Sequence, residues 1–429
     1  MKTFILFPVK LLAYIPFCLL TLAIAKIASF KTAQKAQQAR LVWGPAPIIN
    51  NKYWSRAIKS GGFSSQTFMM GYSDTINTKD DYDEYYDDRY PKVPGFLKRS
   101  LLFWESLFRF DVFVISFNGW LLGPTLLWKL EAFFFALAGK KVILIPFGSD
   151  GYVYRNVKSP SVLHGLMLSY PEMSRRQDAI EERVKYWIKH ADFFYPGIAG
   201  LDGMGRMDAI PFNILCLDLD LWQPSQRNSS ADGKSGTVTI AHAPNHRGFK
   251  GSEFVIHAAE KLKEEGLDIS LILIEKMQNA EVRKILCEDA DILVEQLNVI
   301  GHGLNAIEGM ASGIPVISNL EDETYTLIFR RWGNLDQCPI ASASPETITD
   351  VLRKLVTNPN LRKQLGQAGR QYAEKYHSYD ASAYLFSRVI EFLYGERENV
   401  INLYHPLAGE YEQDRPKIQH PLVNSRIVP

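Results

Sequence analysis

The segment from residue 290 to residue 319 constrains the fold of this chain more than any other. It reads as a short buried strand at 291–294, a glycine loop at 301–303, a helix at 305–311 and a strand opening at 315. A glycine loop before a helix directs backbone N–H groups and the positive end of the helix dipole toward an anion. The segment therefore predicts a phosphate-binding turn, although the glycines taken alone favour an ordinary strand–helix crossover.

A second strand–loop–helix unit lies upstream, at residues 237–266. Its strand is expected at 238–241, its loop carries Arg247 and Lys250, and its amphipathic helix opens at Gly251. Both units place anion-binding groups at the carboxyl end of a strand. In an open α/β sheet that edge is where ligands bind, so the two loops predict one shared site.

Three stretches together resemble the retaining, family-4-type glycosyltransferases of GT-B fold: HAPNHRGFKG, ADILVEQL and GHGLNAIEGMASGIPVI. The resemblance covers residues 236–395. Glu295, Gln296 and Leu297 match the pattern of a polysaccharide-biosynthesis-like subgroup found in bacteria and archaea. The resemblance implies an α/β chain of two Rossmann-like, doubly wound domains that face a cleft.

The resemblance also implies roles for particular residues. Arg247 and Lys250 would bind the diphosphate of a nucleotide-sugar donor, and Glu308 would hold the nucleotide ribose. The remaining residues of the expected donor site are Gly301, Gly303 and Asn305. Glycosyltransferases of this fold bind the donor without an essential metal, so we expect no metal site and no cofactor, the nucleotide-sugar being a co-substrate.

Two positions depart from the family pattern. Ile300 stands where the first glutamate of a paired-glutamate pattern is expected, eight residues before Glu308. Phe147 stands where many relatives have a histidine, just before the turn Gly148-Ser149-Asp150. Neither side chain can hydrogen-bond, which leaves an inactive relative as an alternative. Asp150 is the remaining candidate for a catalytic polar group near the reacting sugar.

The N-terminal part alternates strands with helices, which predicts a parallel sheet covered on both faces. Strands are expected at 41–43, 66–70 and 111–117, a strand running into a loop at 141–150, and helices at 52–59 and 124–138. Four residues fall at the carboxyl ends of these strands and are expected to line the cleft: Gly44, Asn118, Gly148 and Ser149. They could also be simple tight turns.

The first forty residues carry an apolar segment, 3–25, followed by Lys26, Lys31, Lys35 and Arg40. A membrane anchor with the catalytic domains on the cytoplasmic side is the favoured interpretation, because positive charge accumulates after the segment. A cleaved signal peptide and an interfacial or buried helix are the alternatives. The apolar stretch 96–108 is likewise either a core helix or a membrane-surface helix.

Length and composition limit the function classes. A chain of 429 residues with 46% apolar residues has room for two cores. Its net charge of +1 gives no field for nucleic acid. The four cysteines are scattered, which argues against disulfides or a zinc site and suits a reducing compartment. The acidic segment 74–95 is expected to be a solvated loop, with an acceptor-facing flap or a carboxylate cluster as alternatives.

These observations divide the chain into six parts. They are an anchor with its basic flank at 1–40, an acceptor domain at 41–215, a linker at 216–236, a donor domain at 237–379, a helix packing back on the first domain at 380–395, and a tail at 396–429.

The function expected from the resemblance is hexosyl transfer in polysaccharide or cell-envelope synthesis. A sugar would pass from a nucleotide-sugar to a glycan or lipid-linked acceptor with retention of its anomeric configuration. The alternatives are a non-catalytic GT-B module that binds a nucleotide-sugar or a partner enzyme, and a sugar-nucleotide epimerase of the same fold.

Overall fold

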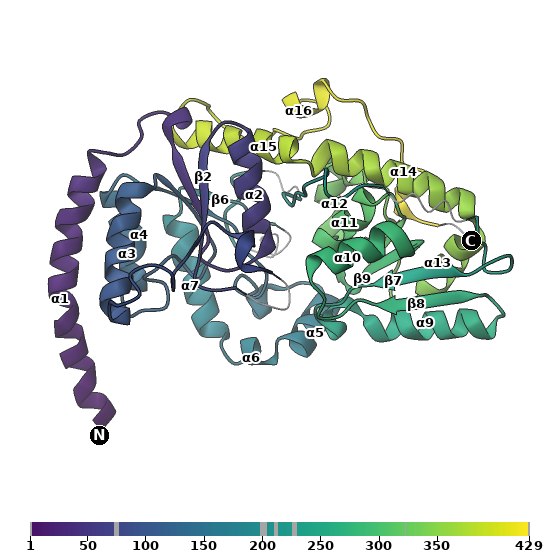
Figure 1. The fold of residues 1–429 in the computed structure, drawn as a ribbon, viewed down its shortest axis with the longest axis horizontal. Helices are drawn as coiled ribbons and strands as arrows, with labels where there is room; N and C mark the ends of the chain where they lie inside the picture. The colour runs from purple at the N-terminus through teal and green to yellow at the C-terminus, as the bar shows by residue number, and fades with distance from the viewer. Residues whose placement is uncertain are drawn as a thin grey trace.

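The computed structural model describes residues 2–72, 77–197, 204–209, 213–224, 230–321 and 323–427. Residues 74–76 of the acidic segment and 225–229 of the expected linker lie outside these ranges. Two parallel sheets, each covered by helices, stand side by side, and a long helix pair runs across the top of both (Figure 1). This arrangement confirms the predicted α/β fold with two doubly wound domains.

The N-terminal sheet has the strand order β3-β2-β1-β4-β5-β6, with every paired strand parallel. The order reverses between β1 and β4, which creates a topological switch point at their carboxyl ends. The strands are β1 (Arg40–Trp43), β2 (Ser64–Met69), β3 (Glu84–Tyr85), β4 (Val112–Ile115), β5 (Lys141–Leu144) and β6 (Phe193–Phe194).

The helices of this domain are α2 (Ile49–Ser60), α3 (Gly95–Arg109), α4 (Glu131–Leu137), α5 (Pro160–Ser169), α6 (Pro171–Ser174) and α7 (Gln177–His190). The helix expected at 124–138 begins only at Glu131, after a single 3-10 turn at Trp128–Leu130. Glu131 is fully buried and accepts the backbone N–H groups of Trp120 and Leu122. The preceding segment therefore folds back over the helix start instead of continuing it.

The C-terminal sheet has the order β11-β10-β9-β7-β8, again all parallel, and its switch point lies between β7 and β9. Its strands are β7 (Val238–His242), β8 (Ile269–Leu273), β9 (Ile292–Ile300), β10 (Val316–Asn319) and β11 (Ala341–Ser342). Its helices are α8 (Arg247–Lys250), α9 (Ser252–Glu264), α10 (Asn279–Lys284), α11 (Leu304–Ala311), α12 (Glu323–Trp332), α13 (Ile348–Thr357) and α14 (Pro359–Tyr376).

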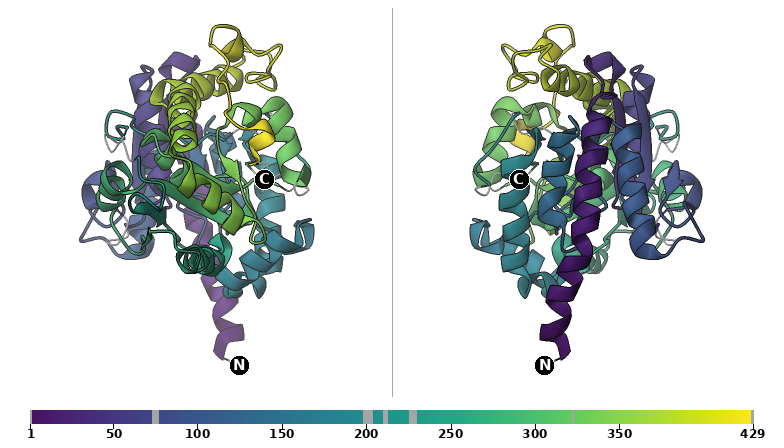
Figure 2. Two further views of the ribbon diagram at one scale, coloured as in Figure 1. Left: turned by 90° about the vertical axis from the view of Figure 1, so that its right-hand side faces the viewer. Right: turned by 90° about the vertical axis from the view of Figure 1, so that its left-hand side faces the viewer.

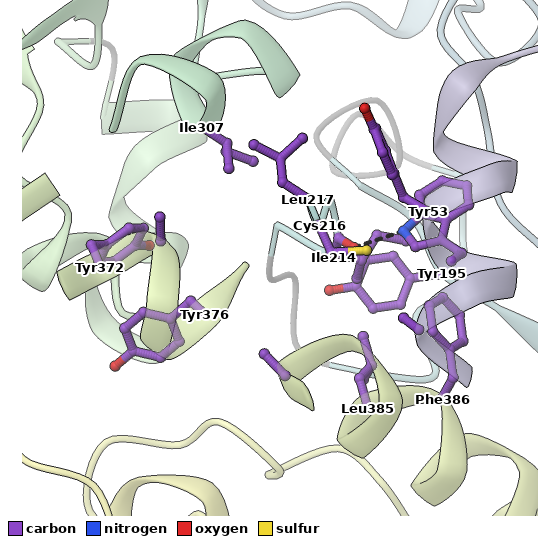
Figure 3. Close-up of a cluster of buried hydrophobic side chains, with 14 of the residues drawn as sticks. Tyr53, Tyr195, Ile214, Cys216, Leu217, Ile307, Tyr372, Tyr376, Leu385 and Phe386 are labelled. Carbon is purple, nitrogen blue, oxygen red and sulfur yellow. Dashed lines mark hydrogen bonds between the residues drawn. The ribbon is translucent and has the colours of Figure 1, made fainter. Parts of the chain in front are cut away.

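Helix α15 (Tyr379–Leu393) follows α14 directly and packs against α2 of the N-terminal domain. Phe386 makes edge contacts with Trp43 and Trp54, at ring-centroid distances of 4.9 and 6.2 Å. One continuous apolar core joins residues of both sheets through this helix, as the cluster around Phe386 and Ile307 illustrates (Figure 3). The tail, with α16 (Glu410–Gln413), adds Tyr404 and Tyr411 to the same core.

Helix α1 (Lys2–Ser29) packs along α3 and α4, and its first turns project beyond the domain (Figures 1 and 2). Phe17, Thr21, Ala25 and Ala28 form its buried face, spaced three or four residues apart. The Trp104 indole of α3 donates a hydrogen bond to the Thr21 hydroxyl, 2.8 Å away. Across the described residues, no helix combines the length and the apolar character that crossing a membrane requires.

Removal of the Phe386 ring should destabilise the protein by about 3–5 kcal/mol, because the ring is almost fully buried between two indoles at the domain junction. The free energy of unfolding of Phe386→Ala, measured by urea denaturation, checks this. Leu407→Ala is the matched control, since Leu407 is 88% exposed and should lose less than about 0.5 kcal/mol. Equal effects of the two substitutions would contradict a shared core at this position.

Candidate functional site

Two loops meet at the switch point of the C-terminal sheet, at the carboxyl ends of β7 and β9. The one-turn helix α8, with Arg247 and Lys250, follows β7. The glycine loop 301–303 follows β9 and leads into α11, for which Gly303 is the N-cap. The expected pair of strand–loop–helix units is therefore present, and its loops are neighbours.

Strand β9 is irregular where it approaches the site. Its register against β10 shifts twice, so that Gln296 pairs with Ser318 and Ile300 pairs with Asn319. Residues 297–299 of β9 have no partner in β10 at these shifts, and the Asn319 side-chain amide holds them by donating to the Leu297 carbonyl at 2.6 Å. Bulges of this kind re-aim side chains beside functional sites. Gly301, at φ +97°, then turns the chain out of the strand in a conformation that favours glycine.

Glu295 links the two loops through hydrogen bonds. Its carboxylate accepts the Gly303 backbone N–H at 2.9 and 3.1 Å and the Lys250 ammonium at 2.9 Å, and it is fully buried. Ser318 donates to the same carboxylate at 3.3 Å. A Cβ at position 303 would lie 2.9 Å from the Glu295 oxygen, so a larger residue there would displace that carboxylate. An internal carboxylate thus occupies the N-terminus of α11, where an anion is favoured.

Both cations expected to bind a diphosphate have internal partners. Lys250 is largely buried and also donates to the Gln296 side-chain oxygen at 2.8 Å. Arg247 is exposed and forms a two-pronged ion pair with Glu275, at 2.8 and 2.9 Å. That pairing raises the pKa of Arg247 further above its ordinary value. In this structure the positive charges of Lys250 and Arg247 are therefore balanced by neighbouring carboxylates, and the site does not present an unbalanced positive charge to a phosphate.

Glu308 lies inside α11 and is buried. Its two oxygens accept the side-chain amides of Asn279 at 3.0 Å and Asn305 at 3.1 Å. Burial raises the pKa of Glu308 to about 7. The Tyr53 hydroxyl of α2 donates to Asn279 at 3.4 Å, which brings the N-terminal domain against this corner. Asn305, expected in the donor site, is thus a direct partner of Glu308.

His242 is the last residue of β7, and both of its ring nitrogens form hydrogen bonds within the protein. Its Nδ1 donates to the Val294 carbonyl at 2.7 Å, and its Nε2 accepts from the Ser252 hydroxyl at 2.8 Å. Burial lowers the pKa of His242 to about 4, so the ring is neutral at physiological pH. His242 thus joins strands β7 and β9 to helix α9.

The Asp150 carboxylate forms hydrogen bonds with the backbone of its own, N-terminal domain. It accepts the N–H groups of Phe147 at 2.8 Å and Phe117 at 3.2 Å. These bonds tie the loop after β5 to the loop after β4. Burial raises the pKa of Asp150 in spite of those hydrogen bonds. The arrangement gives Asp150 a positioning role for the loop that carries Phe147.

A cavity of ≈ 290 Å³ lies between the two domains. Of the residues singled out in the sequence, Phe147, Gly148, Ile300 and Gly301 line it. Gly44, Asn118, Ser149 and the donor-site residues Arg247, Lys250, Gly303, Asn305 and Glu308 do not. Sequence reasoning did not single out the remaining lining residues, which include Asn50, Trp54, Tyr195, His302, Tyr325 and Phe329. Only His302 had a signal, its place between two glycines.

Helix α5 of the N-terminal domain closes the cleft over α8. The Phe249 backbone N–H donates to the Ser169 hydroxyl at 2.8 Å, and the Tyr170 ring packs on His246. Ile300 belongs to the apolar cluster formed here with Val162, Leu166 and Tyr325. Its apolar side chain, in place of a glutamate, therefore joins the two domains.

Comparison with known proteins agrees with this geometry. Residues 259–372, which include the glycine loop and Glu308, match the family described as glycosyl transferases group 1. A search of curated proteins gave no match. The structure of HepE from Anabaena in complex with UDP-glucose is similar, with a TM-score of 0.52 and 10% identity over 83% of this chain and 100% of that one. The chain therefore shares the two-domain GT-B fold, and residues 259–372 are similar to glycosyl transferases group 1.

Two further solved structures show weaker likeness. Sucrose-phosphate synthase from Thermosynechococcus elongatus has a TM-score of 0.46 and 14% identity, covering 84% of this chain and 100% of that one. A putative UDP-N-acetylglucosamine 2-epimerase from Listeria monocytogenes has a TM-score of 0.46 and 11% identity, covering 85% of this chain and 99% of that one.

Glu308→Gln should become more stable relative to the wild type as the pH rises from 5 to 8. The Glu308 carboxyl has a pKa of about 7 in the folded protein, against an ordinary value of 4.5 when unfolded. Between those values the folded state keeps a proton that the unfolded state has lost, so wild-type stability falls with rising pH. The fall is on the order of 3 kcal/mol.

Glutamine has no such proton, so the difference between the two proteins should grow by that amount. Glu131, whose pKa burial also raises to about 7, contributes equally to both proteins. Chemical denaturation at the two pH values measures the difference. A difference that does not change with pH would show that Glu308 titrates normally.

Proposed function

We propose that this protein is a glycosyltransferase that moves a hexosyl group from a nucleotide-sugar to a glycan or lipid-linked acceptor in cell-envelope polysaccharide synthesis. The observation that carries the proposal is the meeting of α8, the glycine loop and Glu308 at one switch point, within a GT-B fold. Retention of anomeric configuration is proposed from the resemblance to retaining enzymes.

On donor binding, cationic side chains of the site would leave their carboxylate partners within the protein and bind the phosphates of the nucleotide instead. Arg247 is exposed and held only by surface carboxylates, so it can turn from Glu275 to a phosphate. The Gly303 N–H and Lys250 are bonded to the buried Glu295 carboxylate, so a phosphate beside α11 would have to displace that carboxylate to reach them. Charge-assisted contacts there would stabilise the nucleoside diphosphate as it leaves the sugar. Glu308 would accept hydrogen bonds from the ribose.

Two other functions remain in competition with transfer. A module that binds a nucleotide-sugar or a partner enzyme without chemistry is favoured by Ile300 and Phe147, which place no polar group at their positions. An epimerase of the same fold would change the sugar while it stays on the nucleotide. Transfer differs from both because it releases a nucleoside diphosphate only when an acceptor is present.

Arg247→Ala should weaken binding of nucleoside diphosphates roughly tenfold or more, because one charge-assisted contact to phosphate is lost. Isothermal calorimetry with a panel of nucleoside diphosphates measures this. Arg353→Ala is the matched control, since Arg353 forms the same two-pronged pair with Glu265 on the far side of the domain. An unchanged affinity of the Arg247 variant for every diphosphate that binds the wild type would refute the diphosphate assignment.

Wild-type protein should release nucleoside diphosphate from its nucleotide-sugar when membrane extract supplies the acceptor, and Glu308→Ala should abolish most of that release. The alanine variant loses the carboxylate proposed to hold the ribose. Glu346→Ala, outside the cleft, is the control. A donor that binds tightly and never turns over would favour the binding module. A changed sugar recovered still attached to its nucleotide would favour the epimerase.

We further propose that α1 lies on the cytoplasmic face of a membrane. Large apolar side chains on its outward side, Ile15, Leu19, Leu20 and Ile27, are exposed, and so is Phe30 just after the helix. They lie opposite the buried face of the helix, and Phe96 and Phe133 of the neighbouring helices are exposed beside them. Lys26 and Lys31 can reach lipid headgroups from the same helix end. An apolar stripe with lysines at its border is typical of an interfacial helix.

Leu19→Glu combined with Ile27→Glu should reduce binding to anionic phospholipid vesicles at least tenfold, because both side chains are at the centre of the exposed stripe. Vesicle flotation of the full chain measures the bound fraction. Leu407→Glu, on an exposed residue of the tail, is the control. Wild-type protein that stays unbound at every lipid composition would rule out this surface.

A further inference from the structure

Helix α5 belongs to the N-terminal domain by its place in the chain, yet it packs mainly on the C-terminal domain. Its principal partners are α8 and β9, and among the helices and strands of its own domain its main partner is the short helix α6 that follows it. Figure 1 shows α6 below the N-terminal domain and α5 beside the C-terminal one. An element whose contacts are divided in this way can leave its partner domain while both cores stay folded.

The contact between α5 and the C-terminal domain is apolar at its centre and hydrogen-bonded at its start. Val162 and Leu166 of α5 are buried in one apolar cluster with Ile300, the last residue of β9. The Ser161 hydroxyl donates to the Asn298 carbonyl of β9 at 2.8 Å. Because Asn298 lies in the stretch of β9 that has no partner in β10, the bulge presents this carbonyl to α5.

The end of α5 covers the backbone of α8. The Ser169 hydroxyl accepts the Phe249 N–H at 2.8 Å, and the Asn298 side-chain amide donates to the Gly248 carbonyl at 2.7 Å. Leu168 lies so close to Gly248 that a Cβ added there would be 2.8 Å from the Leu168 Cβ. Helix α5 therefore fills the space beside the turn that carries the exposed cation expected to bind the diphosphate.

We propose that α5 is a latch that holds the donor site in a state of low affinity for nucleoside diphosphates. Its release uncovers α8 and gives a phosphate access to the turn that carries Arg247. The latch rests on the proposed function, since it takes Arg247 as a phosphate-binding residue. Apparent affinity falls with the fraction of molecules in the binding-competent state, so a seated α5 weakens binding without contacting the ligand.

Gly165, in the middle of α5, offers a matched pair of substitutions. A Cβ there would lie 3.5 Å from the Phe249 Cα and 3.5 Å from a methyl group of Val299, which is ordinary contact. Gly165→Ala therefore fits against α8 and β9, whereas the longer side chain of Gly165→Leu must push α5 away from them. Both alanine and leucine form helices better than glycine, so the pair separates the seating of α5 from its helix stability.

Calorimetry measures the binding of uridine, guanosine, thymidine and adenosine diphosphates to the wild-type protein and both variants. We expect Gly165→Leu to bind the preferred diphosphate roughly threefold tighter or more, and Gly165→Ala to bind it as the wild type does. Equal or weaker binding by a folded Gly165→Leu protein, or equal tightening by Gly165→Ala, would overturn the latch and leave the proposed function intact. If none of the three proteins binds any diphosphate, both fail.

Hydrogen exchange of the wild-type protein tests the latch without a substitution. If a seated α5 disfavours diphosphate binding, a bound diphosphate must disfavour the seated α5 to the same extent. Saturation with the preferred diphosphate should therefore speed amide exchange in α5 roughly threefold or more. Helix α7, whose buried residues pack inside the N-terminal domain, is the control and should not change. Unchanged or slower exchange in α5 would show that the ligand does not release this helix.

Discussion

One apolar core, continuous from the first sheet to the second, holds this molecule in its cleft-forming arrangement. Helix α15 makes it continuous, because it leaves the C-terminal domain after α14 and buries Phe386 between Trp43 and Trp54 of the other domain. The cluster in Figure 3 shows Ile307 of α11 and Phe386 of α15 in that shared interior. The carboxyl edges of both sheets therefore face one another, and the loops at those edges can share a ligand.

The charges of the candidate site are balanced internally. Lys250 is paired with Glu295 in the interior, and Arg247 is paired with Glu275 at the surface. A buried ammonium without a partner would be costly, so Glu295 both satisfies Lys250 and fixes the glycine loop through the Gly303 N–H. The two pairs differ in their freedom to exchange partners, since surface ion pairs contribute little free energy. Arg247 is accordingly the mobile cation and Lys250 the fixed one.

The helix after the glycine loop and the starts of the strands on either side of it followed from the sequence, because buried parallel strands are continuous apolar runs with glycine or proline at their ends, but β9 runs on to Ile300 instead of ending near residue 294. Prediction failed where a distant group decides local structure. The helix expected from 124 starts at Glu131, whose carboxylate accepts backbone N–H groups eleven and nine residues earlier in the chain. Asp150 was expected to be a polar group near the reacting sugar, and the sequence did not indicate that it also binds the Phe117 and Phe147 N–H groups. His302 stood out only by its place between two glycines, because nothing local shows that its Nε2 lacks a hydrogen-bond partner among the described residues.

The sequence by itself determined the two doubly wound sheets, their switch-point loops and the residues able to meet an anion there, since periodicity and glycine placement are local properties of the chain. Tertiary structure alone decided which of those residues face each other and which groups of the protein they already bind. The bulge in β9 brings Glu295 to Gly303, and α5 brings Val162 and Leu166 to Ile300. Such contacts join segments far apart in the chain, and their geometry is set by packing between domains, which no local pattern encodes.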